Sequence, residues 1–236
     1  MKKASGYIVY EGKSQINGDN IVAIVTMKST NTKTGNMASM WILNADMRPT
    51  EASKTGKDES VCGDCKHRAT NKGACYVTLF HAPLKVYKSY KKGNYPTTND
   101  MTIFEGMKVR FGAYGDPSAI PTQILASIKA VVKNNTSYTH QWKANDKILK
   151  QVSMASVDSI EEQKSAVANG WRTFRVTTDL SDKLSNEIIC PNTTKAIQCA
   201  DCGLCSGNSI GAKNIVIEVH GSKKGNFEKQ LATQKV

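Results

Sequence analysis

The sequence contains no run of eighteen apolar residues, so we expect no membrane-spanning helix. No apolar segment follows the two lysines near its start, and we therefore expect no secretory leader and a reducing, cytoplasmic location. The phosphate-binding P-loop, the GxSxG nucleophile elbow and the HExxH metalloprotease helix are also missing. The sequence thus gives no support to three common classes of enzyme.

Acidic residues are scarce, with 20 Asp and Glu against 32 Lys and Arg, which gives a formal charge of +12. Such an excess favours polyanionic partners, although solubility alone would also account for it. Residues 85–95 interleave four lysines with three tyrosines and contain no acid. This mixture suits non-specific binding of nucleic acid by charge and stacking, and the alternative is a solvated amphipathic helix.

Secondary-structure signals divide the 236 residues into two regions. Residues 1–100 predict a strand- and loop-rich N-terminal region that carries the first cysteines. Residues 101–236 predict six short strands that alternate with helical or irregular crossovers. This alternation indicates an α/β fold with an incomplete parallel (βα)6 barrel-like core, with an open doubly wound sheet as the alternative. We expect the two regions to form one compact unit.

Polar and ligating side chains follow the strands of the predicted core. In parallel α/β folds, the carboxyl ends of the strands meet on one face, where chemistry takes place. We therefore expect a pocket formed by Tyr114, Asp116, His140, Trp142, Ser156, Asp158 and Arg175.

The strongest signal comes from four of the seven cysteines. An odd number excludes complete internal pairing, and clustered cysteines in a reducing compartment favour metal binding. Cys190, Cys199, Cys202 and Cys205 have the spacing C-x8-C-x2-C-x2-C. The tight triple run with a fourth cysteine nearby predicts a 4Fe–4S cluster. Zinc is the alternative metal, and buried inert thiols are the alternative without a metal.

The other three cysteines, Cys62, Cys65 and Cys75, have the spacing C-x2-C-x9-C. They are compatible with a cluster that has one open iron, with a zinc site completed by His67, or with a structural role. An exposed side chain is the simplest expectation for His67.

Several motifs, spread from about residue 30 to the C-terminal cysteines, resemble the uncharacterised phage gene product 88 family. They are Asn31-Thr-Lys-Thr-Gly35, Cys62-Gly-Asp-Cys-Lys-His-Arg68, Cys75-Tyr-Val77, Tyr114-Gly-Asp-Pro117, Tyr138-Thr-His-Gln-Trp142, Met154-Ala-Ser-Val-Asp158 and Gly170-Trp-Arg-Thr-Phe-Arg-Val176. This resemblance implies a phage-encoded protein that acts in the cytoplasm of an infected host cell. It implies no activity.

A more distant resemblance is to the radical S-adenosylmethionine enzymes, which have a partial α/β barrel. Cys62, Cys65 and Cys75 would correspond to their three-cysteine loop, and residues 112–117 would correspond to their Gly-Gly-Glu-Pro segment. The usual loop is C-x3-C-x2-C, and Asp116 stands where a glutamate is usual. We therefore predict that this loop does not form a conventional radical S-adenosylmethionine cluster.

Taken together, these patterns predict a 4Fe–4S cluster-binding protein with a radical-enzyme-like partial barrel. The first alternative is a redox or radical enzyme that acts at the strand-end pocket. The second is a zinc-stabilised protein that binds nucleic acid.

Overall fold

The computed structural model describes residues 4–29, 31–221 and 223–234. Its strands are β1 (Gly6–Lys13), β2 (Asn20–Thr26), β3 (Ala38–Asn44), β4 (Lys108–Tyr114), β5 (Asn134–Thr136), β6 (Tyr138–Thr139), β7 (Met154–Val157), β8 (Thr173–Thr177), β9 (Glu187–Ile189) and β10 (Asn214–Glu218). Its α-helices are α1 (Pro49–Thr55), α2 (Glu59–Cys62), α3 (Ala82–Lys91), α4 (Thr122–Val131), α5 (Lys147–Val152), α6 (Ile160–Ala168), α7 (Pro191–Lys195), α8 (Cys199–Cys202) and α9 (Lys224–Gln234).

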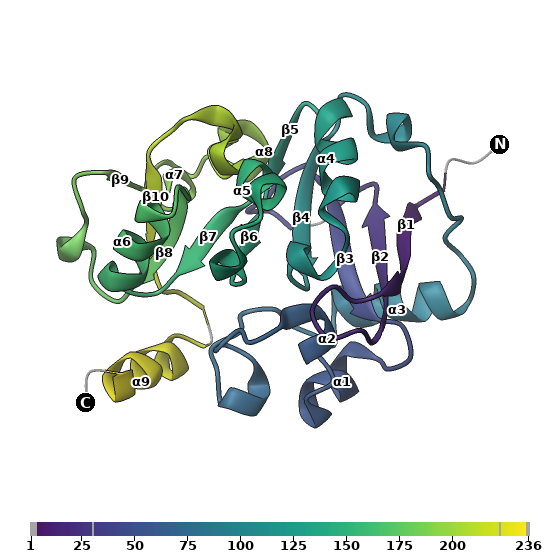
Figure 1. Ribbon diagram of the computed structural model, residues 1–236, viewed down its shortest axis with the longest axis horizontal. Helices are drawn as coiled ribbons and strands as arrows, with labels where there is room; N and C mark the ends of the chain where they lie inside the picture. The colour runs from purple at the N-terminus through teal and green to yellow at the C-terminus, as the bar shows by residue number, and fades with distance from the viewer. Residues whose placement is uncertain (1–3, 30, 222, 235–236) are drawn as a thin grey trace.

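In the described residues, these strands form two five-stranded sheets. The first has the order β1-β2-β3-β4-β5, with antiparallel pairs from β1 to β3 and parallel pairs from β3 to β5. The second has the order β6-β7-β8-β10-β9 and is parallel throughout. Figure 1 shows β1 to β4 on the right of the molecule and β7, β8 and β10 on the left.

The chain passes from one sheet to the other at Ser137, which lies between β5 and β6. The predicted α/β class with parallel strands is confirmed. The predicted barrel is not, because neither sheet closes on itself within the described residues. The expected boundary near residue 100 falls between β3 and β4, which are neighbours in the first sheet.

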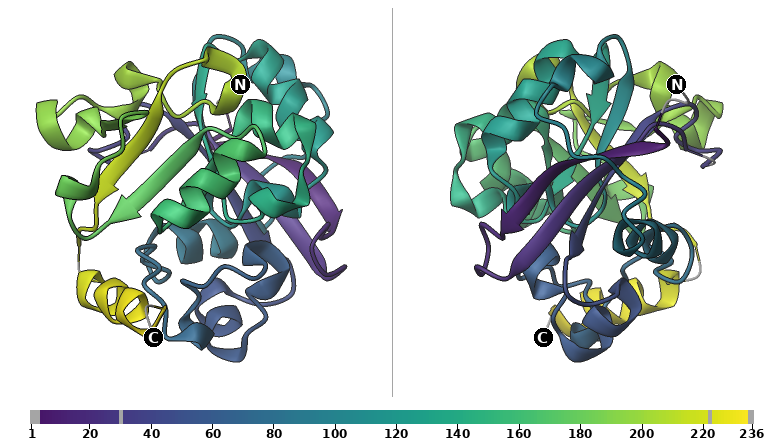
Figure 2. Two further views of the ribbon diagram at one scale, coloured as in Figure 1. Left: turned by 60° about the vertical axis from the view of Figure 1, so that its left-hand side comes forward. Right: turned by 90° about the vertical axis from the view of Figure 1, so that its right-hand side faces the viewer.

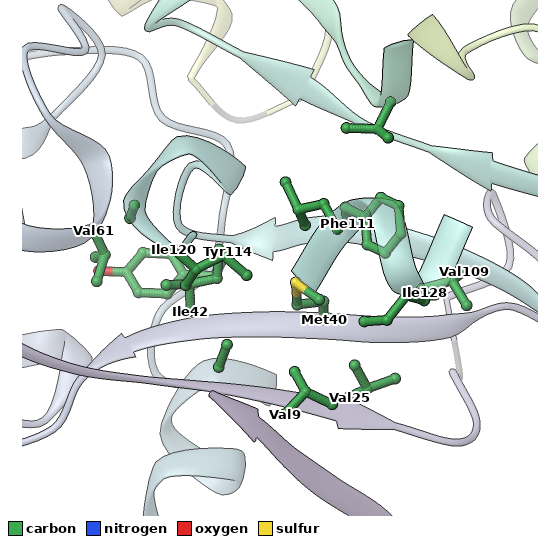
Figure 3. Packing of buried hydrophobic residues seen from close by; sticks show 14 of the residues in the cluster. Val9, Val25, Met40, Ile42, Val61, Val109, Phe111, Tyr114, Ile120 and Ile128 are labelled. Atoms are coloured by element: carbon green, nitrogen blue, oxygen red, sulfur yellow. The ribbon is translucent and has the colours of Figure 1, made fainter. Parts of the chain in front are cut away.

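One hydrophobic core connects the two sheets. Fully buried residues of β2 to β4 pack with Leu125 and Ile128 of α4 and with Ala155 and Val157 of β7. Figure 3 shows the part of this core around Phe111 and Met40, where side chains from neighbouring strands meet those of α4. The two turned views in Figure 2 show helices packed against the sheets, with α9 near the loops that follow α1. Burial of this apolar surface is the main term that stabilises such a fold.

Two helices of the second half, α5 and α6, begin at side-chain caps. The Ser159 hydroxyl accepts a hydrogen bond from the Glu162 backbone N–H at 3.1 Å at the start of α6. The Asp146 carboxylate caps α5 in the same way, at 2.8 Å from the Leu149 nitrogen. Since α5 and α6 flank β7, these caps fix the chain on both sides of that strand.

Among the described helices, none is both long and apolar enough to cross a bilayer.

Candidate metal centres

The backbone of the C-terminal cysteine loop is hydrogen-bonded to the second sheet and to the residue that joins the two sheets. The Cys190 N–H donates to the Val216 carbonyl of β10 at 2.9 Å. The carbonyl of Cys205 accepts from Ser137, the residue between the sheets, at 3.0 Å. The short helix α8 carries Cys199 at its start and Cys202 at its end. Backbone hydrogen bonds therefore position Cys190 and Cys205, and helix α8 positions Cys199 and Cys202.

The N-terminus of α8 rests on an early loop of the chain. The Cys199 N–H donates to the Lys33 carbonyl at 3.1 Å, and the Ala200 N–H donates to the Thr34 carbonyl at 2.9 Å. Gly203 ends the helix with a left-handed backbone, φ +67°, and a Cβ there would lie 2.0 Å from the Asn134 amide nitrogen. This positive φ favours glycine between Cys202 and the turn that leads to Cys205.

The four thiols lie close enough to influence one another's ionisation. Burial raises the pKa of the Cys205 thiol to about 12, a hydrogen bond with Tyr138 opposes this shift, and the other three thiols of the set add to it. Cys190 and Cys205 also pack in a small apolar cluster that includes Met154, Phe174 and Ile215. A negatively charged centre here would be sheltered from water, which is one of the factors that set the potential of an iron–sulfur cluster.

Arg110 of β4 lies beside this loop. Burial raises the pKa of the Cys199 thiol, and the positive charge of Arg110 opposes that increase. The guanidinium of Arg110 donates to the Tyr76 hydroxyl at 2.9 Å, but its Nε is buried and has no partner in the described part of the chain. A buried donor without an acceptor is costly, and a cluster sulfur or thiolate beside it would supply one.

Cysteine thiolates can hold either a single zinc ion or an iron–sulfur cluster. A tetrahedral zinc ion with Zn–S bonds of about 2.3 Å places its sulfurs about 4 Å apart. In the residues that the structure describes, the group of side chains close enough to share one ion is His67, His140 and Asp158, and it contains no cysteine. A 4Fe–4S cluster accepts a wider set, because each thiolate binds a different iron.

The first cysteine loop folds back on itself. Gly73 N–H donates to the Arg68 carbonyl, and Cys75 N–H donates to the His67 carbonyl, both at 3.0 Å. A Cβ on Gly73 would lie 2.2 Å from the His67 backbone, so the close return needs glycine. Burial raises the pKa of Cys65 to about 12, with Cys75 among the contributing charges. The nine-residue spacer thus brings Cys75 back to Cys65.

Three of the predicted strand-end residues meet beside this loop. Asp116 is buried and accepts hydrogen bonds from the Ser118 N–H, the Thr139 hydroxyl and the His140 N–H, at 3.0, 2.7 and 2.8 Å. It thereby ties the end of β4 to the end of β6 and positions His140. Asp158, after β7, completes the group through His67, which forms ring contacts with His140.

The ionisation of this group follows from its burial and its partners. Burial would raise the pKa of Asp158, but the hydrogen bond from His67 and the charges of His67 and Lys66 outweigh it and lower that pKa to about 2. Burial lowers the pKa of His140 below its ordinary value of 6.5. At neutral pH, Asp158 is therefore a carboxylate and His140 a neutral imidazole.

Burial raises the pKa of Tyr114, and the nearby Cys62 and Cys75 add to this shift, so this predicted pocket residue also lies near the first cysteine loop. Tyr114 and Trp142 belong to the hydrophobic core, and Ser156 is partly buried within β7. The Arg175 side chain is buried and makes paired hydrogen bonds with Glu187, both at 2.8 Å, and with Asp182 at 2.9 and 3.0 Å. These contacts join β8 to β9. They pair the guanidinium with the carboxylates of Glu187 and Asp182 rather than with the group around Asp158.

His67, which the sequence offered as a possible fourth ligand of a zinc site with the first three cysteines, lies in this group. The side chain expected to be exposed is only 13% exposed, because it packs against Phe227 of α9 and bonds Asp158. Its partners are 91 and 160 residues away in the sequence. The only local signal was its position between Cys65 and Cys75, in a loop where Gly73 allows the backbone to fold back onto His67.

The lysine- and tyrosine-rich segment forms α3 and the turn after it. Tyr87, Tyr90 and Tyr95 are partly buried against the core, whereas Lys85 and Lys88 are exposed. The tyrosine rings are therefore not free stacking platforms, and the segment matches the amphipathic-helix alternative. The expectation of nucleic-acid binding rests on charge alone.

If the charge of α3 contacts phosphates, replacing Lys85 and Lys88 by serine will reduce the dependence of binding on salt. On single-stranded DNA each lost phosphate contact should reduce the slope of log affinity against log salt by about 0.7, so the double variant should lose about 1.4. Fluorescence anisotropy with single-stranded DNA at several salt concentrations measures this slope. Absence of binding by the wild-type chain even at low salt would contradict the expectation.

Comparison with known proteins supplies no further guidance: no family model, no curated protein and no solved structure matches this chain.

Proposed function

We propose that the protein binds one 4Fe–4S cluster through Cys190, Cys199, Cys202 and Cys205. The observation that carries the proposal is the C-x8-C-x2-C-x2-C spacing of four cysteines on one anchored loop, where their thiols influence one another's ionisation. The unpartnered Arg110 nitrogen beside Cys199 supports it, because a cluster of net negative charge would give that donor an acceptor.

The surrounding residues would set the properties of the bound cluster. A cluster can stabilise the fold directly or carry one electron at a potential set by charge, hydrogen bonds and solvent access. Here Arg110 offsets negative charge, Tyr138 hydrogen-bonds Cys205, and the apolar cluster around Met154 limits water. The first two effects favour the reduced state, and the third opposes it.

Anaerobic purification followed by measurement of iron, sulfide and zinc tests this proposal. A 4Fe–4S cluster gives about four irons and four sulfides per chain and a brown colour that dithionite bleaches. One zinc per chain without sulfide would replace the proposal with a zinc site. About eight irons would show that the first cysteine loop holds a second cluster.

A redox or radical enzyme is the second candidate. The observation in its favour is the fold-back of the first cysteine loop onto the carboxyl ends of β4 and β7, where Asp116 and Asp158 lie. In this proposal the two sheets, joined at Ser137, act together as the wall of an open barrel. We also propose that the protein is related to the phage gene product 88 family and that it acts in the cytoplasm.

We predict that the protein does not cleave S-adenosylmethionine reductively. The Asp116 carboxylate already accepts three hydrogen bonds, so it has little capacity left to bind the cofactor's amino group. Incubation of the reduced protein with S-adenosylmethionine should yield no 5′-deoxyadenosine above a control without protein. Production that disappears in Cys65→Ala would show that the loop holds a radical cluster.

A further inference from the structure

The group formed by His67, His140 and Asp158 has the composition and spacing of a single-ion site. The ligating atoms of the three side chains lie within 4.8 Å of one another. Two imidazoles and one carboxylate are a ligand set that first-row divalent metals favour, and they leave coordination positions open. This group is separate from the four C-terminal cysteines.

The hydrogen bonds of Gln230 fix the tautomer of His67. The Gln230 amide nitrogen donates to the Lys66 carbonyl at 2.9 Å, which turns its Oε1 toward His67 Nδ1, 3.1 Å away. Because a carboxamide oxygen can only accept, Nδ1 must carry the hydrogen. In a neutral His67, Nε2 then carries no hydrogen, and its lone pair points at the Asp158 carboxylate.

That arrangement is incomplete without a positive charge. His67 Nε2 lies 2.7 Å from Asp158 Oδ2, and two acceptors cannot approach so closely unless a proton or a metal ion lies with them. Metal-binding histidines commonly donate their second N–H to an oxygen, as His67 does to Gln230. The structure therefore leaves two ways to satisfy this contact, a proton shared by the two side chains or a bound metal ion.

The rest of the group favours the metal. Asp158 is 1% exposed at its side chain, and its Oδ1 is buried without a partner among the described residues. Lys66 contacts the other oxygen, Oδ2, at 3.0 Å and also bonds Glu162, so a metal on Oδ1 need not displace it. Within the same described ranges, the His140 ring makes no hydrogen bond, although its backbone is held by Asp116.

We propose that His67 Nε2, one ring nitrogen of His140 and Asp158 Oδ1 bind a divalent first-row transition-metal ion. Binding replaces the proton that His67 Nε2 otherwise shares with Asp158, so one proton is released to solvent. The ion would join the first cysteine loop to the ends of β6 and β7 and, through Gln230, to α9.

Histidine NMR with added Zn²⁺ tests this site in the intact wild-type chain. The chain has four histidines, so ¹⁵N-histidine labelling gives a simple spectrum. One equivalent of Zn²⁺ should shift the ring nitrogens of His67 and His140 and leave those of His81 and His220 unchanged. Before zinc is added, Nδ1 of His67 should be protonated. Unchanged His67 and His140 signals would overturn the proposal.

Equilibrium dialysis of cluster-loaded protein against Zn²⁺ measures the zinc affinity of matched variants. His140→Ala and Asp158→Asn should each weaken the binding of one zinc by at least about a hundredfold, since even outer partners of metal ligands contribute 10- to 100-fold. His220→Ala and Cys65→Ser should keep it. Loss in Cys65→Ser with retention in His140→Ala would assign the zinc to the thiols instead and reject this site. The histidine spectrum reports on it even if no iron–sulfur cluster is present.

Discussion

Replacing Cys202 by serine is expected to remove the iron from the protein and to lower its thermal stability. Serine keeps the size of the side chain but replaces a thiolate with a hydroxyl that binds iron poorly. A lost cluster removes binding energy that contributes to folding, so we expect the melting temperature to fall by about 10 °C or more. Iron content, visible absorption and thermal unfolding under anaerobic conditions measure the effect.

Two comparisons separate loss of the cluster from damage to the fold. Cys75→Ser changes a thiol of the other loop and should keep the iron and the colour. The metal-free forms of the wild type and Cys202→Ser should melt at similar temperatures, because Cys202 is only partly buried. An unchanged visible spectrum and iron content in Cys202→Ser would contradict the proposed ligand set.

The second large effect is expected from replacing Arg172, whose side chain is hydrogen-bonded to the backbone in and after the cysteine loop. This guanidinium is buried and donates to the carbonyls of Leu204, Gly207 and Lys213, at 3.0, 2.7 and 2.6 Å. Arg172→Met would leave those buried carbonyls without donors. Since a hydrogen bond to a charged group contributes about 1.5–3 kcal/mol, we expect a loss of at least about 3 kcal/mol in the free energy of unfolding.

The same substitution should also reduce the iron content, because the loop that follows Cys202 would lose its support. Urea unfolding measures the stability, and iron analysis measures the occupancy. The matched control is Arg48→Ala, which removes an exposed pair with Glu51 and should cost less than about 1 kcal/mol. Equal stability of the Arg172 and Arg48 variants would show that the loop does not depend on this contact.

Much of the second half of the fold follows from the local sequence. Strands β7, β8 and β10 come from β-branched and apolar runs, and α6 begins at a serine cap and ends before a glycine, so local propensity and the final structure agree. Strand β5 gave no such signal because it reads Asn-Asn-Thr. Its buried Asn135 is satisfied by the Val152 carbonyl and the Ser206 hydroxyl, partners that no local pattern indicates.

The candidate sites likewise have parts that the local sequence predicts and parts that it does not. The C-terminal cysteines could be grouped from spacing alone, because all four lie within one loop. The convergence of Asp116, His140 and Asp158 could be anticipated from their places after strands. The parts that depend on long-range packing could not be predicted. These are the burial of His67 under α9 and the commitment of Arg175 to Glu187 and Asp182.

The central claim is that the four C-terminal cysteines suffice to bind one cluster. The most direct measurement is the iron and sulfide content, after anaerobic purification, of the triple variant Cys62→Ser, Cys65→Ser, Cys75→Ser. Our account predicts about four irons and four sulfides per chain in this variant. Absence of iron and sulfide from a folded triple variant, with a wild type that contains both, would place the cluster on the first loop and contradict the account.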